Sequence, residues 1–71
     1  MMPLALAPIG EENTVKRIGG RPEIKKHLEN LGLVAGANVT VISEIAGNLI
    51  VNVKESRIAL DKEMAMKIFV Q

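Results

Sequence analysis

One stretch, the corner segment, decides the fold: Leu28-Glu29-Asn30-Leu31-Gly32-Leu33-Val34-Ala35-Gly36-Ala37-Asn38-Val39. Ile24, Leu28 and Leu31 have the i, i+4, i+7 spacing of one helix face. Gly32 follows where a residue at a helix end must adopt a positive φ. Glycine adopts that conformation at the lowest cost because it has no Cβ. The segment therefore predicts a helix that ends at about Leu31.

The corner segment also predicts how the chain continues. With Gly32 as the first residue beyond the helix, Leu33 is expected to pack against Leu28 in the hydrophobic contact of a Schellman ending. Gly36 predicts a second structural turn, and the β-branched run that starts at Val39 predicts a strand. One short segment thus stops a helix, turns the chain and starts a sheet.

Short apolar segments on both sides of this corner predict further strands. Their expected ranges, with the strand that leaves the corner, are 4–7, 14–18, 38–45, 49–54, 57–60 and 68–70. A helix is expected over 22–31, because Pro22 has the preset φ of a first helical position and Glu23 places a negative charge in the first turn. A second helical turn is expected over 62–66, with Asp61 as its N-cap.

Two of these strands carry a more detailed expectation. In the first, Leu4 and Leu6 alternate with alanines, so both leucines are expected to face the core. In the second, Val15 and Ile18 are three positions apart rather than two. A bulge near Lys16-Arg17 would place both on one face.

Many short strands in a small chain predict a curled sheet, because closure buries one face and removes unpaired edges. The chain has 71 residues, of which 48% are hydrophobic. This suits a single domain over residues 1–71, near the lower size limit for one core. The expected fold class is mainly β: a small SH3-like or OB-like β-barrel with one short inserted α-helix and a short C-terminal helical turn.

Charge and composition narrow the functional classes. Nine basic and eight acidic residues give a formal net charge of +1, without the basic excess typical of a dedicated nucleic-acid binder. The absence of cysteine excludes disulfides and thiolate metal sites. The apolar N-terminal run over residues 1–9 has no positive region before it and is too short for a signal peptide or a membrane span. A cytoplasmic location is expected.

The residues available for catalysis are few. There is one histidine, His27, and its only local carboxylate is that of Glu23, so an exposed helix residue is the simpler interpretation than a metal ligand. Neither Ser43 nor Ser56 stands in a nucleophile-elbow pattern. Gly19-Gly20 is not followed by the lysine and hydroxyl residue of a phosphate-binding loop. We therefore expect no enzyme activity, no cofactor and no dedicated metal site.

Basic residues could still gather into a strip that binds nucleic acid. The candidates are Lys16-Arg17, Arg21, Lys25-Lys26, Lys54 and Arg57. Nucleic-acid-binding barrels normally offer aromatic side chains on which bases stack. The one aromatic residue, Phe69, lies in a strand pattern that favours the core. Nucleic-acid binding is therefore a lesser alternative, and no nucleic-acid partner is expected.

Read as a whole, the chain resembles the ferrous iron transport protein A (FeoA) family. The elements that carry the resemblance are Leu4-Ala5-Leu6, Gly19-Gly20, the corner segment, Ile58-Ala59-Leu60, Ala65 and Ile68-Phe69-Val70. They cover nearly the full chain in order. One departure lies before the Arg-Ile-Ala-Leu stretch, where many family members have a glycine and this chain has Val53-Lys54-Glu55-Ser56.

The resemblance implies an SH3-like barrel and a cytoplasmic accessory role beside FeoB, a membrane ferrous iron transporter with a cytoplasmic GTPase domain. It implies a protein-interaction module that meets the membrane only through this partner. Similar domains form the C-terminal part of iron- and manganese-dependent repressors of the DtxR type. A metal-responsive regulatory domain that uses His27 is therefore an alternative, and the pattern predicts no particular oligomeric state.

SH3-like barrels usually bind partners in a groove between loops. On that basis Leu33, Val34 and Arg57 are the expected partner-binding residues, although Leu33 has a competing role in the helix ending. Gly32 and Gly36 are expected to have a structural role in the turn.

Overall fold

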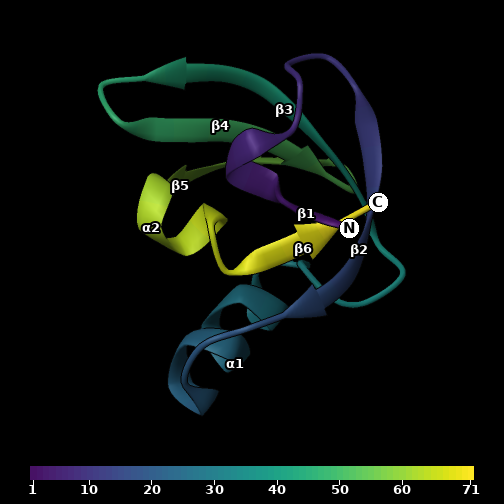
Figure 1. Ribbon diagram of the computed structural model, residues 1–71, viewed down its shortest axis with the longest axis vertical. Coiled ribbons are helices and arrows are strands. Elements are labelled where there is room, and N and C mark those ends of the chain that lie inside the picture. Colours follow the sequence, from purple (N-terminus) through teal and green to yellow (C-terminus); the bar gives the residue numbers. More distant parts are fainter.

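The computed structural model describes residues 1–71 and contains a six-stranded antiparallel sheet with the strand order β1-β6-β2-β3-β4-β5. Figure 1 shows that the sheet curls, so that β3, β4 and β5 lie across from β6 and β2, with α1 below them. The two termini lie side by side because β1 pairs with β6. In chain order the elements are β1 (Met2–Pro3), the 3-10 helix η1 (Leu4–Leu6), β2 (Glu12–Ile18), α1 (Pro22–Asn30), β3 (Asn38–Ile45), β4 (Asn48–Val53), β5 (Ser56–Asp61), α2 (Lys62–Ala65) and β6 (Ile68–Val70).

β2 belongs to both halves of the curled sheet. Its first residues, 12–14, pair with β3, whereas residues 15–18 pair with β6. The register with β6 shifts between Val15 and Arg17. This bulge confirms the sequence-based prediction, and it places both Val15 and Ile18 in the core. A bulge bends a strand, so β2 can leave one half of the sheet and enter the other.

The core consists of one cluster of 15 buried hydrophobic residues drawn from nearly every element. Strand β4 shows the alternation most clearly, because its inward-facing residues are buried and the residues between them are half-buried. The members of the cluster are Leu4, Ala7, Val15, Ile18, Leu28, Leu33, Val39, Val41, Leu49, Val51, Val53, Leu60, Ala65, Ile68 and Val70.

The helix α1 ends as the sequence predicts. The N–H of Gly32 donates to the carbonyl of Glu29 at 3.0 Å, and the N–H of Leu33 donates to the carbonyl of Leu28 at 3.0 Å. These are the two hydrogen bonds of a Schellman motif, and Gly32 has the positive φ of 99° that the motif requires. The side chains of Leu28 and Leu33 are both 0% exposed.

The short helix α2 begins at the predicted cap. The side-chain Oδ1 of Asp61 accepts a hydrogen bond from the N–H of Met64 at 2.7 Å. The cap satisfies one of the N–H groups that lack a partner at a helix start. Ala65 at the other end of α2 is fully buried and belongs to the core cluster. The helix therefore packs against the core at this end.

The expectation of a strand over residues 4–7 is wrong. Leu4–Leu6 forms η1, and the N–H of Ala7 donates to the carbonyl of Leu4 at 3.0 Å. Side chains two positions apart on a 3-10 helix point in different directions. Leu4 is accordingly 0% exposed, whereas Leu6 is 64% exposed. Of the residues before Pro8, only Met2 and Pro3 form a strand, β1, which pairs with β6.

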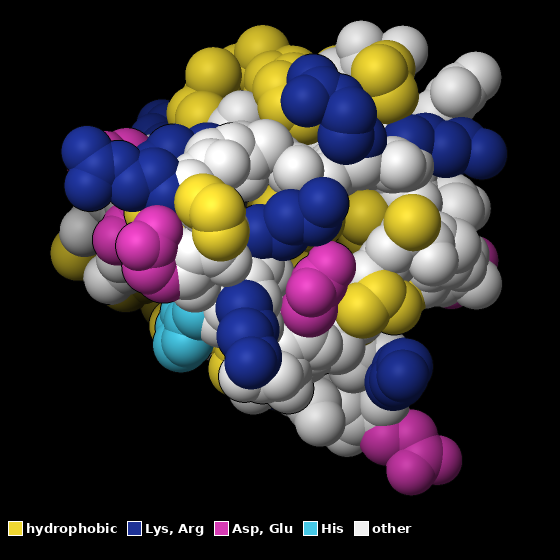
Figure 2. All heavy atoms as spheres, turned by 90° about the horizontal axis from the view of Figure 1, so that it is seen from below, with side chains coloured by type: hydrophobic (Ala, Val, Ile, Leu, Met, Phe, Trp, Pro, Cys, Tyr) yellow, Lys and Arg dark blue, Asp and Glu magenta, His cyan; other side chains and the backbone are white.

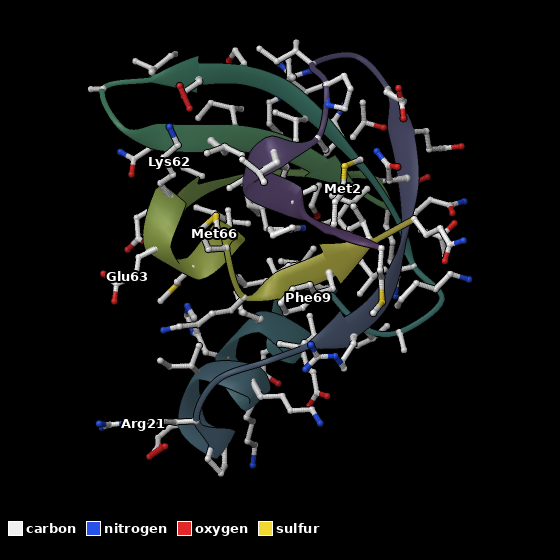
Figure 3. All side chains as sticks on the ribbon, viewed as in Figure 1. Met2, Arg21, Lys62, Glu63, Met66 and Phe69 are labelled. Carbon is white, nitrogen blue, oxygen red and sulfur yellow. The ribbon has the colours of Figure 1, made fainter.

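The expectation that Phe69 lies in the core is also wrong. Strand side chains alternate between faces, and in β6 it is Ile68 and Val70 that point into the core. Phe69 (labelled in Figure 3) is half-buried on the opposite face. Its pairing partner on β2 is Arg17.

Candidate interaction surface

The loop that follows α1 is held against β2 by its backbone. The N–H of Gly36 donates to the carbonyl of Val15 at 2.8 Å, and the N–H of Val15 donates to the carbonyl of Ala37 at 2.8 Å. Gly36 itself has a positive φ of 92°. The two bonds fix the loop at the point where β2 passes from β3 to β6. Val34 is half-buried and Ala35 is exposed on this fixed loop.

Leu33 is a core residue. Its side chain is 0% exposed, because the Schellman ending turns it onto Leu28 beneath the loop. The side chain is therefore not available at the surface. This corrects the expectation that Leu33 contacts a partner directly. The next residue, Val34, is half-buried and therefore does reach solvent.

Arg57 lies on the outer face of β5. It is exposed, and its Nε donates to Oδ1 of Asn52 on β4 at 3.2 Å. The strand register places Arg57 and Asn52 in one row with Thr40 on β3 and Glu12 on β2. The alternation along the sequence predicts that Asn52 faces outward. It does not predict that Asn52 lies beside Arg57 and Thr40, because these neighbours depend on strand order and register.

The structure brings Gly32 of the corner segment close to the β4–β5 hairpin. A Cβ placed on Gly32 would lie 3.8 Å from both γ carbons of Val53, the last residue of β4. The side-chain hydrogen bond of Arg57 goes to Asn52 on β4 and not to the loop that carries Val34. The candidate interaction surface is therefore two neighbouring segments, the loop 34–37 and the outer face of β5 around Arg57, rather than a single cluster.

His27 is exposed on α1. The structure contains no group of three or more His, Cys, Asp or Glu side chains placed to hold a metal ion, and it contains no pocket. Neither α1 nor α2 is long and apolar enough to cross a membrane.

The one aromatic side chain, that of Phe69, is in contact with the side chain of Arg17. The guanidinium carbon Cζ of Arg17 lies 4.3 Å from the centroid of the Phe69 ring, a cation–π contact. Arg17 therefore covers a face of the ring on which a base could otherwise stack. Figure 2 shows that the basic side chains on the face seen from below are separated by acidic, apolar and uncharged atoms rather than gathered into one strip.

Comparison with known proteins extends these observations. The FeoA domain family matches residues 2–71. The Fe(2+) transport protein A of Methanocaldococcus jannaschii is 38% identical over 71 residues, which is 100% of this chain and 87% of that protein.

Solved structures share the fold. The FeoA of Stenotrophomonas maltophilia, described as a prokaryotic SH3 domain protein and solved in complex with zinc, superposes with a TM-score of 0.87 at 25% identity. The match covers 100% of this chain and 91% of that one. A manganese-dependent transcriptional repressor superposes with a TM-score of 0.84 at 24% identity. That match covers 94% of this chain and 39% of the repressor, and at this identity it shows a common fold alone. The fold is therefore the SH3-like one, as expected, and the chain belongs to the FeoA family of ferrous iron transport accessory proteins.

Proposed function

We propose that the protein is a non-catalytic interaction module of ferrous iron uptake that acts in the cytoplasm on the GTPase portion of the transporter FeoB. The observation that carries this proposal is the family match over residues 2–71. The 38% identity to an Fe(2+) transport protein A supports the same role.

The surface proposed to meet the transporter consists of Val34 and the outer face of β5 around Arg57. Val34 lies just before Gly36 and Ala37, whose backbone is held by hydrogen bonds to Val15 on β2. A loop that is already ordered loses less conformational entropy on binding than a mobile loop. Arg57 is partly oriented by Asn52, and it would pair with an acidic group of the partner.

Binding can be measured by titrating the full chain against the purified cytoplasmic portion of FeoB from the same organism. The titration would be run without nucleotide, with GDP and with a non-hydrolysable GTP analogue. We expect Val34→Glu to raise Kd by about tenfold or more in the binding-competent state, because it places a charge in an apolar contact. We expect Arg57→Glu to raise Kd by a similar factor.

The matched control is Lys16→Glu, which makes the same charge change as Arg57→Glu on the exposed bulge of β2. This variant should bind like the unmodified chain. Absence of binding in all three nucleotide states, across low and moderate salt, would overturn the proposal. Equal losses in Arg57→Glu and Lys16→Glu, which make the same charge change, would instead show general electrostatic attraction.

A further inference from the structure

The strand β5 has an unpaired edge. It is the last strand on its side of the sheet and pairs only with β4 (Figure 1). No backbone hydrogen bond outside that pairing involves residues 54–61. The pairing with β4 has no register shift, so β5 has no bulge, and β5 contains no proline. These are features of a strand that can accept another strand.

The ladder with β4 shows which backbone groups point outward. The N–H of Lys62 donates to the carbonyl of Gly47 at 3.2 Å, and these residues continue the β4–β5 register. Hydrogen-bonded pairs alternate along an antiparallel ladder. The backbone groups of Ile58 therefore face β4, whereas those of Arg57 and Ala59 face away from it. Both of these residues are exposed.

We propose that this edge binds the same edge of a second copy of the chain, antiparallel, with a two-fold axis at Ala59. In that register Ala59 lies opposite its own equivalent, and the outward backbone groups of the two copies meet. Ile58, which is half-buried, lies opposite Leu60. Arg57 lies opposite Asp61 of the second copy, and the symmetry repeats this pair.

Charge complementarity selects this register. Directly opposed residues in an antiparallel pair have Cβ atoms about 4.5–5.5 Å apart, so opposite charges attract there and like charges repel. An axis at Ile58 would place Asp61 opposite Glu55. An axis at Arg57 would place Arg57 opposite its own equivalent. Only the axis at Ala59 gives two attractive pairs within the length of the strand.

Both charged side chains keep free atoms for such pairing. Arg57 uses Nε for its bond to Asn52, which leaves its two terminal nitrogens. Asp61 uses Oδ1 for the N–H of Met64, which leaves Oδ2. The intermolecular pairs can therefore form without breaking a hydrogen bond of the monomer. A ribbon this short buries less area than a standard interface, so a weak, concentration-dependent dimer is expected.

The first test is analytical ultracentrifugation of the full chain alone, at concentrations up to about 1 mM, the range that weak, small interfaces require. We expect reversible dimerisation that Arg57→Glu and Asp61→Lys each weaken by about tenfold or more. An equimolar mixture of these two variants should dimerise again, because each intermolecular pair then joins opposite charges. Lys16→Glu, with the same charge change on β2, should dimerise like the unmodified chain.

Because Asp61 also caps α2, the folding of Asp61→Lys is checked by circular dichroism. Asp61→Asn retains a capping side chain and removes the charge. If Asp61→Lys does not fold, Asp61→Asn takes its place in the test. Asp61→Asn should still weaken the dimer, although less than a charge reversal does.

The second test uses the absence of cysteine from the chain. Opposed residues of a hydrogen-bonded antiparallel pair have Cα atoms about 5.5 Å apart, which is within disulfide range. Mild oxidation should therefore link Ala59→Cys into a covalent dimer. Ala35→Cys, which places the single thiol on the exposed corner loop, should remain monomeric.

A chain that stays monomeric at the highest concentration would overturn the proposal. So would a dimer that is insensitive to both charge reversals, or one in which Ala59→Cys fails to cross-link. The dimer would use the side chain of Arg57, which also belongs to the surface proposed to meet FeoB, so the second copy and the transporter would compete for it. No transporter is present in these measurements. Failure to dimerise would therefore overturn the pairing of β5 without contradicting the proposed binding to FeoB.

Discussion

At the scale of single residues, Gly32 carries the clearest backbone requirement. Its φ of 99° lies in a region where an L-residue is strained. Space is not limiting, because an added Cβ would be in ordinary contact with Val53 at 3.8 Å. Gly32→Ala should therefore lower the free energy of unfolding by about 1–2 kcal/mol through the conformation alone, measured by urea denaturation.

The matched control for this prediction is Ala35→Val, which enlarges an exposed residue of the same loop. Ala35 does not have a positive φ, so its replacement should change stability by no more than about 0.5 kcal/mol. Identical denaturation midpoints for Gly32→Ala and the unmodified chain would contradict the strain argument.

At the scale of elements, the start of α2 depends on one side chain. The 2.7 Å bond from the N–H of Met64 to Asp61 satisfies a donor that Asp61→Ala would leave without a protein partner. The expected loss in the free energy of unfolding is about 1 kcal/mol, within a range of about 0.5–2 kcal/mol. Asp61→Asn should lose less, because asparagine also caps helices well. Thermal melting of both variants would check the order, and equal losses would show that the cap is not the cause.

The elements that the sequence predicted correctly are those whose signals are local. The α1 ending needed only the spacing of Leu28 and Leu33 around Gly32, and the cap of α2 needed only Asp61. The segment at Leu4–Leu6 failed because an apolar alternation four residues long fits more than one backbone geometry. Pro3 precedes this segment and Pro8 follows it, and Leu4–Leu6 between them forms the 3-10 helix η1.

The candidate surface was harder to predict than the elements. Val34 and Arg57 are at least partly exposed, but whether Leu33 is a surface or a core residue depends on what lies beneath the loop. The pairing of Phe69 with Arg17 depends on β6 joining β2, a contact between the two ends of the chain. Strand order likewise decides that β5, and not β3 or β4, has a free edge. Hydrophobic patterns specify which face of a strand is buried, but not which strands are neighbours.

At the scale of the whole molecule, Leu33 tests how much stability the corner segment contributes. A chain of 71 residues, at about 0.05–0.15 kcal/mol per residue, has a total stability of roughly 4–11 kcal/mol. Leu33→Ala removes buried side-chain volume from a site that is 0% exposed, and it should lower the free energy of unfolding by about 2–5 kcal/mol. This single change would remove a large part of the total.

Val34→Ala is the neighbouring control for Leu33→Ala. Val34 is only half-buried, so its truncation removes less buried apolar area and should cost about 1 kcal/mol or less. Urea denaturation of both variants would measure the difference. If Leu33→Ala proved no more destabilising than Val34→Ala, the placement of Leu33 in the core would be contradicted. If the expected difference is found, any effect of Leu33→Ala on transporter binding must be measured at a temperature and urea concentration where the variant is still folded, because unfolding alone would abolish the surface that Val34 and Arg57 present.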